Sequence, residues 1–217
     1  MAGIDSTSST ERIRNCGLLS LLLLASNAAS AGDWTALPGS TLGFSASFQG
    51  EAFEGKFGKF TPQIRFDPAK LAGSQFNVSI DVASADTKNE ERDQGLRSAE
   101  FFNAKKNPQA RYVATKFRAL GGNRFAADGV LTLNGVSKPV PLNFTWTAGA
   151  KPVLAGSASL KRLDFSVGTG EWNDTALLPN EVKVTTRLML TPVAGKPTST
   201  SAPAAKKPVP TAPAKKS

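Results

Sequence analysis

Any catalytic chemistry in this chain would have to come from carboxylates, because its 217 residues include no histidine and a single cysteine. Histidine is the commonest general base and metal ligand near neutral pH. The cysteine, Cys16, lies in a segment that we expect to be removed from the mature protein. We therefore expect no catalytic residue, no metal site and no catalytic cofactor, and we exclude thiolate catalysis and disulfides.

Four acidic residues remain as candidates for an enzyme: Asp93, Asp164, Glu171 and Asp174. Two carboxylates at a suitable separation can cleave a glycosidic bond. Nothing in the spacing of these four marks such a pair, and charged residues are common in turns. A carboxylate-based hydrolase acting in the cell envelope is therefore the alternative to the binding function that the rest of the sequence favours.

The N-terminal segment has the pattern of a secretory signal peptide. Arg12 and Arg14 precede a short leucine-rich run, and the small residues Ala29-Ser30-Ala31 follow it. This order of basic, apolar and small residues predicts a signal over residues 1–31. A signal of this kind implies a periplasmic or secreted protein. The next part, residues 32–194, has the length of one domain.

Positive charge is concentrated at the C-terminal end. Residues 195–217 are nearly all Pro, Ala, Ser, Thr and Lys, which predicts a disordered tail. Of the formal charge of +9, the five lysines of the tail supply +5 and the domain the remaining +4, since the signal is neutral. So mild an excess in the domain gives no indication of nucleic-acid binding. The tail either contacts anionic envelope surfaces, as a tether of a structural envelope protein would, or is a solubilising end.

Apolar and polar residues alternate with a period of two through most of the domain, which is the pattern of half-buried β-strands. Asn134-Gly135 and Gly121-Gly122-Asn123 predict hairpin turns, because Asn and Gly tolerate a positive φ. Eight strands are predicted, over Leu42–Phe48, Phe60–Phe66, Phe76–Val82, Val113–Ala119, Phe125–Leu133, Val140–Trp146, Leu154–Leu160 and Val182–Leu190.

Eight antiparallel strands joined by short turns predict an all-β, up-and-down barrel, because closure removes both exposed edges. Strands of about 8–10 residues at a tilt of ~40° give an axis of roughly 20–25 Å. Small residues on the inward faces, such as Ala127, Gly129 and Ala158, favour space for one ligand. The alternative is that they only fit the taper of a filled barrel.

The segment from Asn89 to Tyr112 interrupts this alternation. Asn89 is a good N-cap and two glutamates follow it at the positive start of a helix, while Gly95 keeps that helix short. We predict a short helix between the third and fourth strands. The adjacent Phe101 and Phe102 are expected to cover an apolar opening of the barrel.

Four segments of the domain contain recognisable sequence motifs. They are Ser47–Pro68, Glu91–Phe117 (ERDQGLRSAEFFNAKKNPQARYVATKF), Asp128–Phe144 (DGVLTLNGVSKPVPLNF), and Arg162–Gly168 followed by Glu181–Leu190. In these segments the sequence resembles the YceI-like family of exported, lipocalin-like barrels that bind polyisoprenoids. The second segment is the most specific of the four. Together they extend from about Gly39 to Leu190.

The resemblance implies an eight-stranded, lipocalin-like barrel with a short helix near one opening. It also implies an isoprenoid chain inside the barrel, as in quinones or lipid-linked carriers. Relatives often carry histidine in the first strand and at the position of Gly95, so no role of those histidines carries over to this chain.

The candidate ligand contacts are apolar residues on the inward faces and at the rim. Thirteen Phe against one Tyr favour apolar contact without hydrogen bonding. Arg92, Arg97 and Arg162 are candidates for holding a polar headgroup. The lipid-binding candidates are Phe44, Phe48, Phe60, Phe76, Ile80, Phe101, Phe102, Phe117, Leu131, Phe144 and Trp146.

Two further alternatives concern the setting of the barrel. A barrel that spans the outer membrane needs aromatic girdles at both ends, for which one Tyr and three Trp are few. A long isoprenoid chain exceeds an axis of roughly 20–25 Å, so it would bend, protrude or reach into a second copy. A homodimer is therefore one arrangement that the ligand would favour.

Overall fold

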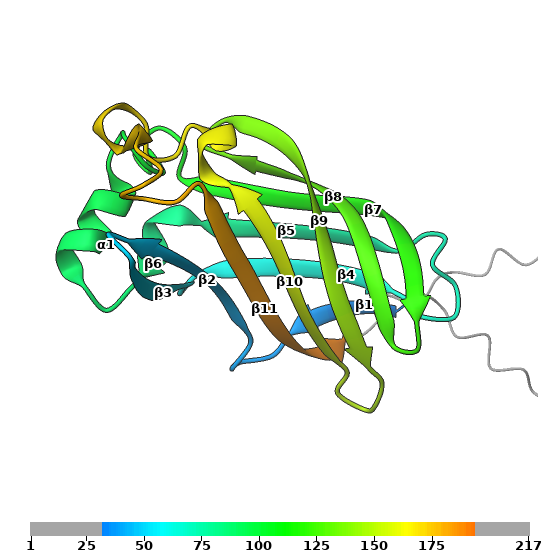
Figure 1. Cartoon of the computed structure of the whole chain (residues 1–217). Coiled ribbons are helices and arrows are strands. Elements are labelled where there is room, and N and C mark those ends of the chain that lie inside the picture. Colours follow the sequence, from blue (N-terminus) through cyan, green and yellow to red (C-terminus); the bar gives the residue numbers. More distant parts are fainter. Residues whose placement is uncertain (1–31, 194–217) are drawn as a thin grey trace, which may run out of the picture.

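The computed structural model describes residues 32–193. The predicted signal peptide, residues 1–31, and the predicted tail, residues 195–217, lie outside the described residues. Residue 194, the last of the predicted domain, also lies outside them, and Val193 is the last residue described. Eight antiparallel strands close into a barrel, as predicted (Figure 1). In order around the wall they are β1 (Gly32–Ala36), β4 (Phe60–Phe66), β5 (Gln75–Asp81), β7 (Gln109–Gly121), β8 (Arg124–Leu133), β9 (Val136–Thr147), β10 (Val153–Lys161) and β11 (Glu181–Pro192).

The closing strand differs from the prediction. The segment predicted as the first strand forms β2 (Thr41–Phe48), but the short β1 closes the ring, because β1 pairs with both β4 and β11. The chain turns between them at Gly39, whose φ of +88° suits glycine. As a result β2 continues along β11 toward the other end of the barrel.

Two more strands extend the wall beyond β2. They are β3 (Glu51–Phe57), which pairs with β2, and β6 (Ala85–Asp86), which pairs with β3. The sequence prediction missed β3, although Phe53, Gly55 and Phe57 alternate there with charged residues. This extension places β3 and β6 beside α1 at one end of the barrel (Figure 1).

The predicted helix is present as α1 (Glu90–Arg97), between β5 and β7. The Asn89 side chain accepts a hydrogen bond of 2.9 Å from the backbone N–H of Arg92, which confirms it as the N-cap. Leu96 is the buried apolar residue of this short helix. Helical turns η1 (Val82–Ser84), η2 (Arg162–Phe165) and η3 (Gly170–Asn173) complete the elements.

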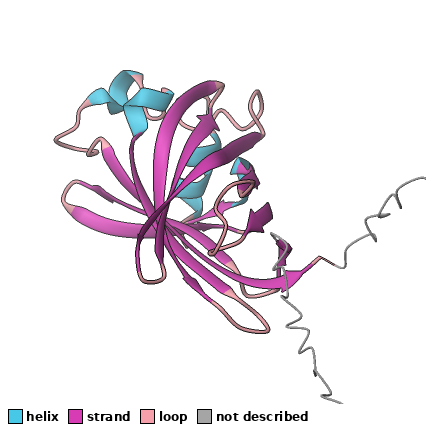
Figure 2. Ribbon diagram, turned by 90° about the vertical axis from the view of Figure 1, so that its right-hand side faces the viewer, coloured by secondary structure: helices cyan, strands magenta, loops and turns pink. Residues whose placement is uncertain are grey.

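Helical segments form a small part of the molecule and strands form the rest (Figure 2). The buried apolar side chains fall into two clusters along the barrel axis. One contains Phe66 and Trp146 near β1, and the other contains Leu96 and Phe102 near α1. The interior therefore divides into an end near β1 and an end near α1.

Candidate functional site

A group of packed aromatic rings fills the barrel at the end near β1. Phe66 is 1% exposed, and its ring centroid lies 5.0 Å from that of Trp146 and 5.3 Å from that of Phe144. Tilted and edge-on contacts of this kind stabilise beyond burial alone. We call this group the aromatic plug; its members are Trp34, Phe66, Phe117, Phe125, Phe144 and Trp146, with Phe76 at its border.

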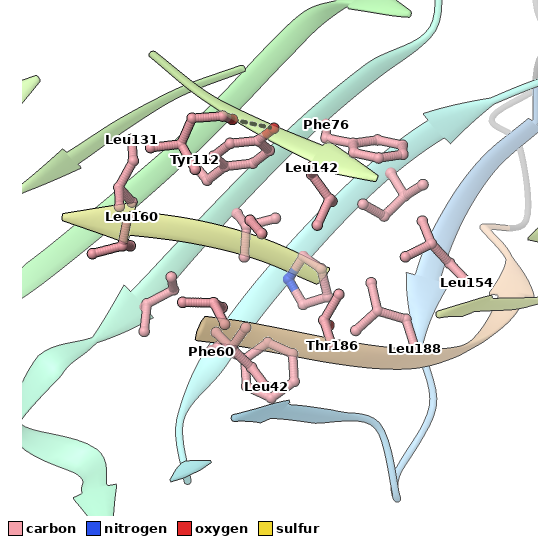
Figure 3. A pocket seen from close by; sticks show the side chains of 17 residues that line it. Leu42, Phe60, Phe76, Tyr112, Leu131, Leu142, Leu154, Leu160, Thr186 and Leu188 are labelled. Carbon is pink, nitrogen blue, oxygen red and sulfur yellow. Dashed lines mark hydrogen bonds between the residues drawn. The ribbon is translucent and has the colours of Figure 1, made fainter. Parts of the chain in front are cut away.

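An apolar cavity lies between the plug and the middle of the barrel, and we call it the barrel cavity (Figure 3). Its cavity volume is about 100 Å³. Residues from seven strands of the ring and from β2 line it. Its lining is Leu42, Phe60, Pro62, Ile64, Phe76, Val78, Ile80, Tyr112, Leu131, Val140, Leu142, Leu154, Ala158, Leu160, Val184, Thr186 and Leu188.

The two polar side chains on this lining are already hydrogen-bonded. The Tyr112 hydroxyl lies 3.1 Å from the carbonyl oxygen of Ala127 and 3.1 Å from that of Val140. Figure 3 marks the contact with Val140. Burial raises the pKa of Tyr112 above its ordinary value, so the phenol stays neutral. The Thr186 hydroxyl donates to the carbonyl of Thr41 at 3.0 Å. A ligand in this cavity therefore meets an apolar wall.

A second apolar cavity adjoins the first on the side of α1, and we call it the lid cavity. Its cavity volume is about 140 Å³, and five residues line both cavities: Leu42, Ile80, Leu131, Leu160 and Val184. The rest of its lining is Phe44, Ala46, Phe53, Phe57, Leu96, Phe101, Phe102, Ala110, Leu133, Arg162, Val167, Leu178 and Val182. The two cavities together form an elongated apolar interior between the plug and α1.

Two segments cover the lid cavity. One is α1 with the turn that follows it, from which Leu96 and Phe102 are both 8% exposed. The other is the segment 162–180, which we call the strap. The strap is joined to the turn after α1, because the backbone N–H of Gly168 donates to the Glu100 carbonyl at 2.8 Å and the Trp172 indole donates to the Glu100 carboxylate at 2.9 Å.

Arg162 holds the strap in place. Its guanidinium is 2% exposed, and burial lowers its pKa because the charged form is disfavoured there. All five of its N–H donors are directed at backbone carbonyls of the strap, at 2.5–3.2 Å. The acceptors are the carbonyl oxygens of Val167, Gly168, Trp172, Leu178 and Pro179.

The predicted headgroup residues have other partners in the structure. The guanidinium of Arg162 has no donor left for a ligand, so its assignment to a headgroup is corrected to a structural one. Arg97 donates to the carbonyl of Ala83 at 3.0 Å. Arg92 lies over the Phe53 ring, 4.3 Å from its centroid. The arginines near α1 thus hold that end of the barrel together.

Seven of the eleven predicted lipid contacts line the cavities. The plug contains Phe117, Phe144 and Trp146, so these three lie beyond the cavity wall. Phe48 lies at the end of β2, 6.0 Å from Trp172 between ring centroids, and lines neither cavity. Alternation fixes which face of a strand a residue occupies, but not whether the space at that depth is filled. The seven that line the cavities are Phe44, Phe60, Phe76, Ile80, Phe101, Phe102 and Leu131.

Apart from Phe101 and Phe102, sequence reasoning missed the apolar lining residues that lie outside the strands. Leu96, Val167 and Leu178 are each less than a tenth exposed and line the lid cavity. Only Leu96 lies in the predicted helix, and the other two belong to irregular backbone with no periodic signal. The strand residues Leu42 and Val184, in contrast, follow the same alternation as the predicted contacts.

The four candidate carboxylates line neither cavity. Asp93 is 5% exposed and accepts from the backbone N–H and the hydroxyl of Thr87, at 2.8 and 2.7 Å. Asp164, Glu171 and Asp174 are exposed. Within residues 32–193 no group of His, Cys, Asp and Glu is arranged to hold a metal ion.

Among the helices of the described part, none has the length and apolar character needed to cross a bilayer.

Comparison with known proteins places the chain in a family. The family model described as YceI-like domain matches residues 34–190. A UPF0312 protein of Photorhabdus laumondii subsp. laumondii is 39% identical over 156 residues, which cover 67% of this chain and 81% of that relative. For relatives from Serratia proteamaculans and Vibrio cholerae, the match spans slightly less than two thirds of the relative.

Two solved structures share the fold. The crystal structure of Burkholderia cenocepacia BcnA is 35% identical, with a TM-score of 0.66 over 69% of this chain and 94% of that one. A polyisoprenoid binding domain from Saccharophagus degradans, implicated in plant cell wall breakdown, is 19% identical, with a TM-score of 0.57 over 76% and 99%. The family match, the relatives and the closed barrel agree, and the chain belongs to the YceI-like family.

Proposed function

We propose that this protein is an exported binding protein that holds the isoprenoid chain of a lipid, either a polyprenyl or a quinone-like compound, inside its barrel. The observation that carries this proposal is the pair of adjoining cavities, whose few polar groups are already bonded to the protein. A site of this kind selects for a ligand that needs no hydrogen bond. The protein would act by holding its ligand, not by transforming it.

The shape and the apolar lining of the interior support a chain-like ligand. Burial of apolar surface contributes about 25 cal/mol per Å², so a long hydrocarbon chain can bind tightly by contact alone. The cavities follow one another from the plug to α1, which suits an elongated molecule better than a round one. The name of the Saccharophagus degradans domain, which has the same fold, adds support for a polyisoprenoid.

The proposed location is the periplasm or the medium, and it rests on the signal-like residues 1–31. Cell fractionation tests it: the protein is expected in the periplasmic fraction without detergent, and deletion of residues 2–31 should leave it in the cytoplasm. Retention of the full chain in the cytoplasm would contradict export, and a need for detergent would favour a membrane-bound form.

The ligand is tested by extraction. The protein is purified from its secreted or periplasmic fraction under several growth conditions, and its organic extract is analysed by mass spectrometry. We expect an isoprenoid lipid in near-stoichiometric amount. A matched extract of an unrelated protein purified in parallel is the control. Fatty acids in place of isoprenoids would keep a lipid-binding barrel and overturn the ligand class.

A further inference from the structure

The wall of the barrel is incomplete between two neighbouring strands. Cross-strand pairing of β9 with β10 runs from Val153 opposite Thr147 to Ser157 opposite Asn143. Beyond this point β9 remains paired with β8 as far as Val136, and β10 remains paired with β11. Between residues 139–142 and 158–161, no pairing joins the two strands in the described chain. Figure 1 shows the strands parting toward the α1 end.

We call this interruption the β9–β10 slot. Four residues of strand correspond to a length of roughly 13 Å. The paired residues Asn143 and Ser157 bound it at one end. At the other end the strap crosses to the β8–β9 hairpin, where the Asn134 side chain donates to the carbonyl of Ser166 at 3.0 Å.

The sequence explains why β9 leaves β10. A two-residue turn joins β8 to β9 and sets Leu133 opposite Val136, so alternate residues from Val136 bond to β8. Pro139 and Pro141 belong to the other set, whose backbone faces β10. Proline has no N–H, so β9 lacks a donor at both positions that face the slot. The sequence KPVP, residues 138–141, thus leaves this part of β9 without the N–H donors that pairing with β10 needs, and it forms an unpaired strand edge.

The facing edge of β10 keeps its donors. By the same alternation from Ser157, the backbone N–H groups of Ser159 and Lys161 point toward β9. Neither group donates to a backbone or side-chain acceptor across the slot in residues 32–193. Lys138, which precedes the unpaired part of β9, and Lys161, at the end of β10, are exposed, and within the described chain neither forms an ion pair.

Both edges of the slot contribute residues to the lining of the barrel cavity. Leu142 from β9 and Leu160 from β10 point into the same cavity from the two edges (Figure 3). Ala158 lines it beside them and is half-buried, whereas Leu154, in the paired part of β10, is 1% exposed. Side chains that line the barrel cavity thus lie on both edges of the slot.

We propose that the ligand chain crosses the barrel wall at the β9–β10 slot and that its polar end stays there, bound by the N–H groups of Ser159 and Lys161 and by the ammonium groups of Lys138 and Lys161. The head group would carry acceptor oxygens, and the two lysines favour an anionic one, a phosphate. The plug closes one end of the interior, and α1 with the strap closes the other. A polar head group buried inside would lose its hydrogen bonds to water.

This inference rests on the proposed function and is tested with geranylgeranyl phosphate and geranylgeraniol as probes. The full chain should bind the phosphate about tenfold more tightly, because charge-assisted hydrogen bonds have at least this effect. The double variant Lys138→Gln/Lys161→Gln should lose that preference and keep its affinity for the alcohol. The control Lys70→Gln/Lys151→Gln changes the charge equally at exposed positions outside the slot and should keep the preference.

A second experiment tests the path by closing the slot. In a Cys16→Ser background, Pro141→Cys and Ser159→Cys place one exposed thiol on each edge, and a bis-maleimide joins them after the probe is loaded. Release into phosphatidylcholine vesicles should become at least about tenfold slower on cross-linking. The control pair Asn143→Cys/Ser157→Cys cross-links strands that are already paired, and release should not change.

The outcomes separate the two proposals. If neither probe binds the unmodified chain, the proposed function fails and this inference fails with it. If the probes bind but the slot cross-link leaves release unchanged, the ligand leaves past α1 and the strap instead. That result overturns this inference alone. Equal affinity of the unmodified chain for the phosphate and the alcohol would overturn the assignment of the head group.

Discussion

At the scale of single residues, Arg162 has a role in the fold where the sequence suggested a role in binding. It is charged, and the sequence alone makes it a candidate for holding a headgroup. In the structure its donors hold five carbonyls of the strap, which irregular backbone leaves without partners of its own. Buried polar groups need such partners, so this arginine maintains the closed end of the cavity.

Replacement of Arg162 should therefore destabilise the fold. We expect Arg162→Met to lower the free energy of unfolding by at least about 3 kcal/mol, because five buried carbonyls lose a charged donor. Arg162→Lys should restore little, since one ammonium cannot reach five acceptors. Urea denaturation measures this, with Arg92→Met as a control that should cost about 1 kcal/mol or less. Equal losses in the two variants would refute the structural role.

Two neighbouring residues of β8 test whether the inward face of the barrel holds the lipid. Leu131 lines both cavities, whereas Val130 is 46% exposed on the outer face. Leu131→Glu should abolish retention of bound lipid, because a carboxylate on the cavity wall would have to be desolvated. Val130→Glu should retain lipid like the unmodified protein. Lipid per mole of purified, folded protein is the measurement, with circular dichroism as the test of folding.

If Leu131→Glu does not fold, Leu131→Trp provides the same test by filling the space where the two cavities meet. Retention of lipid by a folded variant of either kind, at the level of Val130→Glu, would show that the ligand lies elsewhere.

The pH dependence of stability reports on Tyr112. Burial raises its pKa in the folded state above the ordinary value of 10.0. The stabilising contribution is therefore complete below pH 10 and is lost as the pH rises further, because unfolding releases the proton. The chain has one tyrosine, so phenolate absorbance follows this group alone. Tyr112→Phe should make the loss of stability above pH 10 less steep, and an ordinary titration curve in the folded protein would contradict the buried phenol.

At the scale of elements, glycines have opposite roles in β8 and α1. A Cβ at Gly129 would overlap the Tyr112 ring, whereas a Cβ at Gly95 would meet no atom within 4 Å. We expect Gly129→Ala to destabilise by about 1–3 kcal/mol through overpacking, and Gly95→Ala to stabilise by up to about 1 kcal/mol. Thermal unfolding of both variants checks this. Destabilisation by Gly95→Ala would show that α1 needs a flexible residue there.

The strand pattern and the helix could be predicted from the sequence because each depends on local order. Period-two alternation identified the strands, and the N-cap Asn89 identified α1. The closing role of β1 could not be predicted, since five residues around Trp34 show too short a pattern. Nor could the boundary between plug and cavity, because Phe144 and Leu142 alternate identically and differ only in what packs against them.

The strap illustrates a different limit of sequence reasoning. Its residues Val167 and Leu178 follow no period, and their position depends on contacts that Arg162 makes to distant carbonyls. KPVP, in contrast, is a local signal for an unpaired strand edge. The sequence alone does not say which neighbouring strand is left unpaired, and the structure identifies it as β10.

At the scale of the whole molecule, the domain is a barrel closed at one end by aromatic rings and at the other by α1 and the strap, with an apolar interior between them. Its exported location and its basic tail, residues 195–217, remain predictions from the sequence. Removal of the tail should not change lipid retention, since the cavities are formed by residues 42–188.

Native mass spectrometry of the intact protein, purified without detergent from the cells that make it, tests the central claim most directly. We expect a species heavier than the bare chain by the mass of one isoprenoid lipid, which is released on activation and identified in the same experiment. The Leu131→Glu variant should lack this species and Val130→Glu should keep it. A folded protein that is found only at the mass of the bare chain, under every growth condition, would contradict the account.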